Sequence, residues 1–189
     1  MRFHRLASNA PVQIERWGPR DLLRHLDAAM TIYADAMDYP AETGRAHAGF
    51  TATHTSRPGF RATAAMAGTR LTGFGYGYTS APGQWWHDQV RAALSEVDTV
   101  RWLADCFELC ELHVSPDWQG RGIGRELLTL LVDGVVERNV LLSTPEGDTR
   151  AWRLYRSLGF VDILRHHYFP GDGRPFAVLG ATLPFTPDA

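Results

Sequence analysis

His113 to Leu131, with the sequence HVSPDWQGRGIGRELLTLL, place a glycine-rich turn directly between an apolar strand and an amphipathic helix. Gly120, Gly122 and Gly124 let the backbone pass close to a ligand, because glycine has no Cβ. The first amides of the following helix have no partner within that helix, and the positive end of the helix dipole lies behind them. This turn therefore predicts an anion-binding site.

Two well-known phosphate loops are excluded by counting along this turn. A Walker loop needs a lysine followed by serine or threonine, and the chain contains no lysine. A dinucleotide fingerprint that starts at Gly120 needs a glycine where Arg125 stands. The turn is therefore of a third type.

The pattern that fits is Gln or Arg, two residues, Gly, one residue, and Gly or Ala, which Gln119, Gly122 and Gly124 provide. Here the chain resembles the GCN5-related N-acetyltransferase (GNAT) family, in which this turn holds the pyrophosphate of acetyl-coenzyme A. The segment ELHVSPDWQGRGIG and the later LYRSLGF at 154–160 carry the resemblance. It implies an α/β fold with a mixed, partly parallel central sheet flanked by helices, and transfer of an acetyl group from acetyl-CoA to an amine.

Length and composition favour one globular domain over residues 1–189, with the specific motifs concentrated in 108–160. The 19 basic side chains, all arginine, and 21 acidic ones give a net charge of −2, which disfavours nucleic acid as a partner. No apolar stretch approaches the roughly 18 residues of a membrane span. The first residues, MRFHRLASNAPVQIERW, lack the apolar block of a signal peptide. We therefore expect a cytoplasmic protein without a membrane partner.

The two cysteines are expected to be free core residues. Cys106 and Cys110 lie in an expected strand, where four residues span about 13 Å, too far for a disulfide. Their spacing is not that of a zinc knuckle, and most histidines are scattered. No metal is implied.

Hydrophobic periodicity predicts alternating strands and helices along the chain. In 70–79, glycines 73, 75 and 77 alternate with aromatic residues, so one face of this strand has no side chains and something is expected to approach it closely. An insertion at 81–105 is expected to contain a short helix at 89–95. The other expected elements are strands at 11–17, 60–67, 106–114 and NVLLS, helices from Pro19 through Tyr33, after Pro40 to His54, at 127–135 and at 149–157, and two strands in 161–183.

Acetyl transfer needs a deprotonated amine and a proton for the departing thiolate. Tyr155, at the LY position of the family motif, is the candidate acid. For the base, Glu108 lies eleven residues before Gln119, the spacing found in histone-acetylating members of the family, and Glu111 is its competitor. The two glutamates should point to opposite faces of the strand unless a bulge intervenes. The choice between them stays open.

The resemblance also assigns residues to acetyl-CoA. The strand before the turn should line the pantetheine and the thioester, and the turn itself should hold the pyrophosphate; at least one of its two arginines is expected to be solvated. Asp148 stands where many relatives have asparagine, and a carboxylate cannot donate the hydrogen bond of an amide. The expected cofactor-binding residues are Leu112, His113, Val114, Gln119, Gly120, Arg121, Gly122, Ile123, Gly124, Arg125 and Asp148.

The acceptor amine is expected near the first two helices and the insertion, at Tyr33, Asp38, Trp85 and Trp86. Aromatic walls with an acidic residue suit a cationic amine. A small-molecule amine is favoured because the two tryptophans suggest a covered site. The alternatives are a peptide N-terminus, a protein lysine, or a non-catalytic acyl-CoA sensor, and a homodimer that covers Trp85 and Trp86 stays open.

Overall fold

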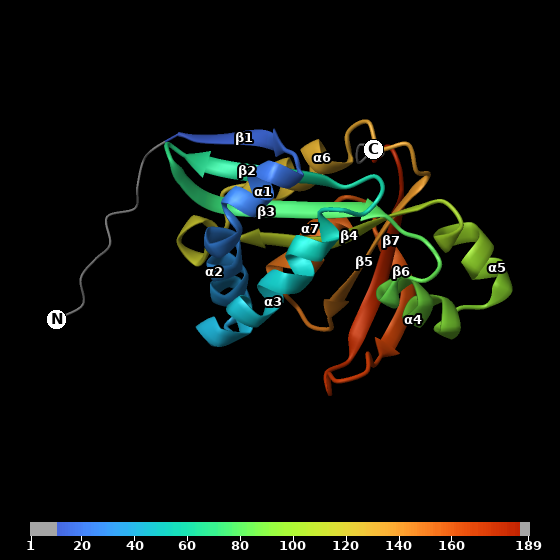
Figure 1. Cartoon of the computed structure of the whole chain (residues 1–189). Coiled ribbons are helices and arrows are strands. Elements are labelled where there is room, and N and C mark those ends of the chain that lie inside the picture. The colour runs from blue at the N-terminus through green and yellow to red at the C-terminus, as the bar shows by residue number, and fades with distance from the viewer. Residues whose placement is uncertain (1–10, 186–189) are drawn as a thin grey trace.

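The computed structural model describes residues 11–185 and contains a seven-stranded sheet in the order β1-β2-β3-β4-β5-β7-β6 (Figure 1). Residues 1–10, which begin the segment without a signal-peptide pattern, and residues 186–189 lie outside the described part of the chain. All neighbouring strands are antiparallel except β4 and β5, so the expected mixed, partly parallel sheet is confirmed. The strands are β1 (Val12–Trp17), β2 (Arg61–Ala67), β3 (Arg70–Thr79), β4 (Cys106–Val114), β5 (Asn139–Pro145), β6 (Val161–His167) and β7 (Phe176–Thr182).

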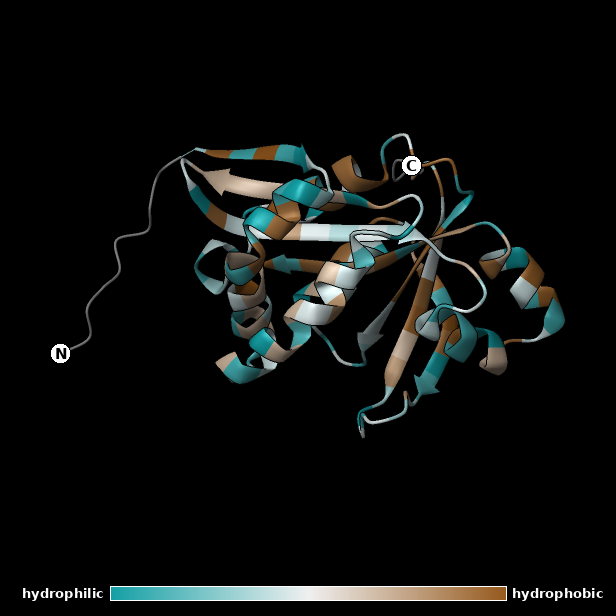
Figure 2. Cartoon of the chain, in the orientation of Figure 1, coloured by the Kyte–Doolittle hydropathy of each residue, from teal (hydrophilic) through white to brown (hydrophobic). Residues whose placement is uncertain are grey.

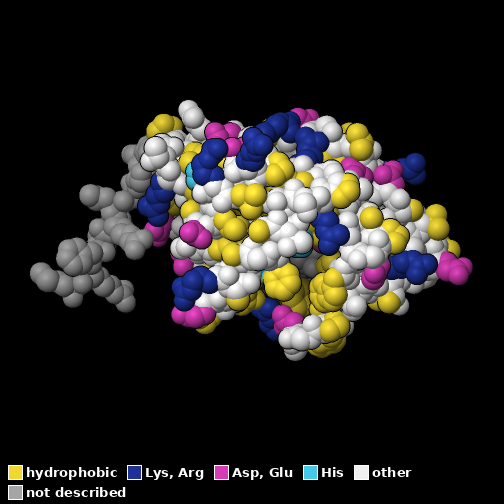
Figure 3. Space-filling view, viewed as in Figure 1, with side chains coloured by type: hydrophobic (Ala, Val, Ile, Leu, Met, Phe, Trp, Pro, Cys, Tyr) yellow, Lys and Arg dark blue, Asp and Glu magenta, His cyan; other side chains and the backbone are white. Residues whose placement is uncertain are grey.

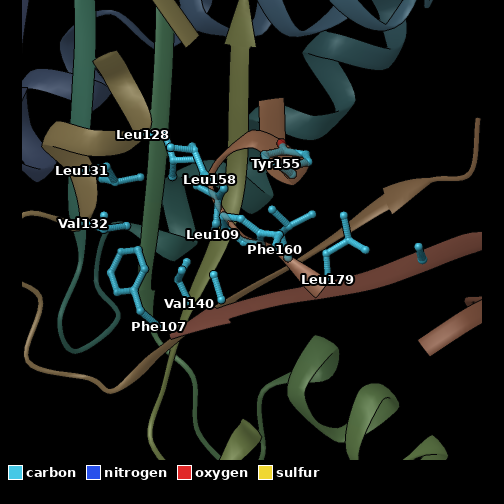
Figure 4. Packing of buried hydrophobic residues seen from close by; sticks show 13 residues of the cluster. Phe107, Leu109, Leu128, Leu131, Val132, Val140, Tyr155, Leu158, Phe160 and Leu179 are labelled. Atoms are coloured by element: carbon cyan, nitrogen blue, oxygen red, sulfur yellow. The ribbon is translucent and has the colours of Figure 1, made fainter. Parts of the chain in front are cut away.

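Helices cover both faces of the sheet, with α2 and α3 in front of it in Figure 1. On the opposite face, α6 and α7 pack on β4, β5 and β7 in the cluster of Figure 4, which includes Phe107, Leu128 and Tyr155. Figure 2 shows apolar residues concentrated along the sheet, whereas α3 is pale or hydrophilic over most of its length. The helices are α1 (Pro19–Arg24), α2 (Leu26–Met37), α3 (Ala41–His54), α4 (Trp85–Ala93), α5 (Glu96–Asp98), η1 (Thr99–Leu103), η2 (Pro116–Trp118), α6 (Ile123–Val132) and α7 (Arg150–Ser157).

Helix α6 (Ile123–Val132) begins and ends earlier than the expected 127–135, and two further helical segments differ from their expected bounds because of packing. The first helix is interrupted at His25, whose ring stacks on Trp17 with centroids 4.6 Å apart and whose backbone (φ −107°, ψ 16°) leaves the helical region. In the insertion, the helix begins at Trp85 rather than at residue 89, because Trp86 and Val90 pack into a core with Trp102 of η1. Tertiary packing therefore overrides the local pattern at both places.

The parallel pair β4 and β5 is short. Only Cys106–Glu108 pair with Asn139–Leu141, and beyond Glu108 the two strands continue without pairing to each other. A gap therefore opens between the second half of β4 and the end of β5. The remaining residues of β4 border this gap.

A bulge in β4 decides where its side chains point. Tyr76 of β3 pairs with Glu111, but the next residue, Gly77, pairs with Leu109, which leaves Cys110 without a partner. The bare face of β3 is filled as expected, since a Cβ on Gly77 would lie 2.2 Å from the carbonyl oxygen of Glu108. Glycine is therefore required where the bulged strand crosses it.

Helix α3 approaches α2 closely because of Gly44. A Cβ on Gly44 would lie 2.6 Å from the backbone oxygen of Met30 on α2, so any side chain there forces the helices apart. Helix α3 has little apolar surface of its own, and this close contact places it beside the sheet.

We expect Gly44→Ala to lower the free energy of unfolding by about 1–3 kcal/mol, because the added methyl group overpacks the contact between α2 and α3. Gly49→Ala on the same helix is the matched control. Position 49 is exposed with open space around it, so alanine should raise stability by about 0.5–1 kcal/mol through helix propensity. Urea unfolding measures both, and equal effects at the two positions would contradict the close-contact role of Gly44.

Candidate functional site

The glycine turn between β4 and α6 has the form expected for an anion site. Gly120 (φ 77°) and Gly122 (φ 82°) adopt the left-handed conformation, and no side chain caps the first turn of α6. Within residues 11–185, none of the five successive backbone N–H groups from Gly120 to Gly124 has a hydrogen-bond acceptor. These donors, at the positive end of a ten-residue helix, fit a pyrophosphate group.

The Gln119 side chain holds this turn in shape. Gln119 Nε2 donates a hydrogen bond of 3.0 Å to the carbonyl oxygen of Val114, at the end of β4. Its Oε1 accepts one of 3.5 Å from Arg150 at the start of α7. The backbone N–H of Gln119 donates to the carbonyl oxygen of Pro116 at 3.4 Å, and its side chain connects the end of β4 with the start of α7.

The side chains of the two arginines of the turn contact neighbouring side chains. Arg121 lies over the Trp118 ring, 4.8 Å from its centroid. Arg125 Nη2 donates a 2.5 Å hydrogen bond to Ser157 Oγ on α7. Both side chains are on the exposed surface beside the free amides, so both add positive charge to the anion site.

Tyr155 lies on α7, on the face of the sheet that α6 and α7 cover. Its side chain is buried at the edge of the cluster in Figure 4, and its hydroxyl has no hydrogen-bond partner among residues 11–185. Burial raises the pKa of Tyr155, and the charge of nearby Glu111 raises it further. The phenol therefore stays protonated across the neutral range.

On the opposite face, Glu111 joins two histidines in one buried cluster. His47 Nε2, from α3, lies 2.8 Å from Glu111 Oε1, and His113 Nε2, from β4, lies 2.5 Å from Glu111 Oε2. Burial raises the pKa of Glu111, but the hydrogen bonds from His113 and His47 outweigh it and bring the pKa down to about 2. Glu111 is thus a carboxylate at any physiological pH.

Tyr33 of α2 holds the rings of this cluster in place. It stacks on His47 with centroids 4.6 Å apart and planes 14° from parallel, and meets His113 edge-on at 5.2 Å. Burial, followed by the charge of Glu111, raises the pKa of Tyr33 to about 12. The sequence-predicted acceptor residue Tyr33 therefore lies directly against two ring donors of the Glu111 carboxylate.

Glu108 points to the same face as Glu111, because the bulge at Cys110 corrects the alternation of the strand. Tyr78 and Cys110 donate long hydrogen bonds of 3.4 and 3.5 Å to Glu108 Oε1, and Oε2 has no partner in residues 11–185. Burial raises the pKa of Glu108 to about 7, and those hydrogen bonds offset only part of the effect. The two competing glutamates therefore have opposite electrostatic environments.

The other predicted acceptor and cofactor residues are dispersed. Trp86 is buried and donates to Ser143 Oγ at 3.1 Å, and its place in an acceptor wall stays a prediction. Trp85 is 57% exposed and packs near Phe169, available to an acceptor or a second subunit. Asp38 ends α2 in a left-handed conformation. The side chain of Asp148 is 89% exposed and forms an ion pair with Arg153.

His47 is the member of the cluster that sequence reasoning missed. It lies in AETGRAHAGF, a weakly amphipathic segment, and its partner Glu111 is 64 residues away. The available signal was Gly44 one turn earlier, which marks the face of α3 that packs closely. Within residues 11–185, no cluster of acidic, histidine or cysteine side chains is arranged to hold a metal ion, and no helix has the length and apolar character needed to cross a bilayer.

Comparison with known proteins agrees with this geometry. The sequence model of the acetyltransferase (GNAT) family matches residues 26–160. The chain is 43% identical over 196 residues to a GCN5-like protein acetyltransferase of Mycobacterium tuberculosis, a match that covers 88% of this chain and 95% of that protein. It is 38% identical over 78 residues to the ribosomal protein bS18-alanine N-acetyltransferase of Escherichia coli, which covers 39% of this chain and 53% of that one.

Solved structures share the fold. The crystal structure of the ribosomal-protein-S18-alanine N-acetyltransferase of E. coli aligns with a TM-score of 0.61 at 20% identity, covering 91% of this chain and 94% of that one. The PaiA N-acetyltransferase of Thermoplasma acidophilum in complex with coenzyme A aligns with a TM-score of 0.59 at 15% identity, covering 91% and 99%. This chain therefore belongs to the GNAT family of acetyl-CoA-dependent N-acetyltransferases.

Proposed function

We propose that this chain transfers the acetyl group of acetyl-CoA to an amine of a protein acceptor. The observation that carries the proposal is the 43% identity, over 88% of this chain, to a relative named as a protein acetyltransferase. A shorter match to an enzyme that acetylates the alanine of a ribosomal protein agrees with it. The names of both relatives describe acetylation of proteins, whereas the sequence pattern alone favoured a small amine.

The free amides of the glycine turn would hold the pyrophosphate of acetyl-CoA, and the backbone of Leu112, His113 and Val114 would hold its pantetheine along the gap. Acetyl-CoA supplies an acetyl group activated as a thioester. In this proposal the gap is reached from both faces of the sheet, because no pairing between β4 and β5 closes it. The acceptor can therefore approach from the face of α2 and α3 while Tyr155 acts from the other.

Tyr155 is the proton donor in this proposal. Its phenol is buried, stays protonated at neutral pH and has no partner of its own in residues 11–185. The charge of Glu111 adds to the effect of burial and raises the pKa of Tyr155 further, which keeps the phenol protonated for this role. A thiolate that leaves in the gap can take the proton of Tyr155.

In this proposal Glu111, rather than Glu108, faces the place where the acceptor amine binds. Glu111 is ionised and held by two histidines, so it gives the acceptor end of the gap a fixed negative charge that attracts an ammonium group. Glu108 lies deeper, beside the last residues of β4 that pair with β5, and holds its proton up to near neutral pH.

The surface around the cluster suits a polypeptide. Phe50 of α3 is 66% exposed and its ring lies 6.0 Å from that of His47. Figure 3 shows hydrophobic side chains gathered between α3 and the β6–β7 hairpin on this face. Residues that follow the reactive amine in a peptide could pack on this surface.

A small primary amine is the second candidate. The Tyr39 ring, after α2, lies 5.5 Å from the guanidinium of Arg174 on the β6–β7 hairpin, so the two sides of the acceptor region meet there. Contact across the mouth of the site narrows access, which favours a small acceptor or a chain end over the middle of a folded surface.

A panel of three acceptors tests the acceptor class by mass spectrometry. It contains a lysine-free peptide with a free N-terminal alanine, an N-acetylated peptide with one lysine, and spermidine. Because the chain itself has no lysine, acetyl-lysine can come only from the acceptor. We expect product on at least one peptide. Product on spermidine alone would contradict a protein acceptor, and no product on any acceptor would contradict the proposed function.

Tyr155→Phe separates proton donation from binding. We expect kcat to fall by about 10²-fold or more, because only the hydroxyl is removed. Calorimetric titration should show an unchanged affinity for acetyl-CoA. Equal loss of affinity and turnover would contradict the assigned role.

Glu108→Gln tests the environment of the second glutamate. The unfolded carboxyl loses its proton near pH 4.5 and the folded one near pH 7, so the folded state binds more protons between these values and stability falls as pH rises. Wild type should lose roughly 1–3 kcal/mol from this group between pH 5 and 8.

The variant cannot titrate at this position, so it should lack that loss in urea unfolding. Glu42→Gln, at an exposed ion pair on α3, is the control and should keep the wild-type slope. Equal slopes for wild type and Glu108→Gln would show that the carboxyl titrates normally.

A further inference from the structure

The inference concerns His47 and rests on the proposed acetyl transfer. Glu111 is ionised, and an ionised carboxylate only accepts hydrogen bonds. The Nε2 atoms of His47 and His113 that face it must therefore carry their protons. In the neutral form of each ring, Nδ1 then has a free lone pair, and within residues 11–185 neither Nδ1 has a hydrogen-bond partner.

His47 is the outermost member of the cluster. Its side chain is 27% exposed, compared with 13% for Glu111 and 11% for His113. An amine that enters from the face of α2 and α3 meets His47 first. His113 lies behind it, between β4 and the edge of the Tyr33 ring.

The His47 ring is held in place on each side. Tyr33 stacks on one face of the ring, Phe50 lies next to it on α3, and the hydrogen bond to Glu111 sets its rotation. The ionisable groups that face the cluster are Glu111 and His113 from β4, Tyr76 from β3, Tyr33 from α2 with Tyr39 after it, His54 from α3, Tyr155 from α7, and Asp172 and Arg174 from the β6–β7 hairpin.

We infer that His47 is the general base of the reaction, and that Glu111 and His113 position it. The acceptor ammonium gives one proton to Nδ1 of His47, and the free amine forms a C–N bond to the acetyl carbon. The C–S bond breaks, the thiolate takes a proton from Tyr155, and Tyr155 regains a proton from the nitrogen of the new amide. The proton on His47 passes to solvent, which balances the transfer.

This arrangement gives each of the two histidines that contact Glu111 a separate role. The carboxylate beside His47 accepts the hydrogen bond of its Nε2 and so holds the tautomer that leaves Nδ1 free. His113 satisfies the second oxygen of Glu111, so the buried carboxylate is fully paired. The carboxylate acts through His47 and does not need to reach the amine.

Two substitutions at His47 separate proton transfer from structure. His47→Gln keeps a side-chain N–H for Glu111 but has no basic nitrogen, and His47→Ala leaves space for free imidazole. We expect both to lower kcat/KM by about 10²-fold or more on the amine that wild type acetylates in the three-acceptor panel. Acetyl-CoA affinity should be unchanged in both.

Free imidazole should restore activity to His47→Ala but not to His47→Gln or Tyr155→Phe. The rate of His47→Ala without imidazole should rise with pH toward the pKa of the acceptor amine, because the variant needs an amine that is already neutral. His166→Asn is the control: His166 is exposed on β6 with φ 52°, which asparagine tolerates, and this variant should keep wild-type rates.

Activity of His47→Gln within twofold of wild type would overturn the inference, since His47 would then be only a partner of Glu111. Failure of imidazole to rescue His47→Ala while acetyl-CoA still binds would also overturn it. If wild type acetylates only spermidine, the protein acceptor is contradicted, but the His47 variants can still be compared with wild type on spermidine. Absence of wild-type turnover on every acceptor overturns the proposed function and this inference together.

Discussion

The separation of β4 from β5 after the pair Glu108–Leu141 is the constraint on which the site depends. Up to that pair the two strands form a parallel ladder, and beyond it they no longer pair with each other, which leaves backbone groups on the facing edges without a strand partner there. In the proposed reaction, Tyr155 acts at this gap from the face of α7 and His47 from the face of α3. A fully paired sheet would keep Tyr155 and the Glu111 cluster on separate sides of a closed wall.

The bulge at Cys110 decides which charged side chains of β4 face α2 and α3. It turns two glutamates three residues apart to the same face, where Glu111 has a histidine close to each oxygen and Glu108 accepts two long hydrogen bonds at a single oxygen. Two ring donors outweigh the cost of burying Glu111, whereas one oxygen of Glu108 has no partner among residues 11–185 and Glu108 keeps its proton to near neutral pH. Both glutamates are buried on one strand, yet Glu111 is a carboxylate and Glu108 holds its proton to near neutral pH.

Local patterns predicted the parts of the fold that local interactions decide. The glycine turn, the strand before it and the helix after it follow from residue types that have few alternatives, and the resemblance carried by Gln119 and the LYRSLGF segment correctly predicted the family. The strand with alternating glycines predicted a close neighbour, and Gly77 has one in the backbone of β4.

The remainder depends on contacts between distant segments. The choice between the two glutamates required the register of β3 on β4, which no periodicity encodes. His47 reaches Glu111 only because Gly44 lets α3 lie close against α2, and α3 has too little apolar surface to reveal its packing face. In the insertion the helix begins at Trp85 rather than at residue 89, because Trp86 packs into a core with Trp102 of η1.

The most direct test of this account is a crystal structure with coenzyme A and an acetylated product peptide bound together. The account predicts the thiol sulfur in the gap between β4 and β5 with the Tyr155 hydroxyl beside it. It also predicts the product amide nitrogen within hydrogen-bond distance of His47 Nδ1, on the face of α2 and α3. A peptide bound on the α6 and α7 face, or a thiol outside the gap, would contradict it.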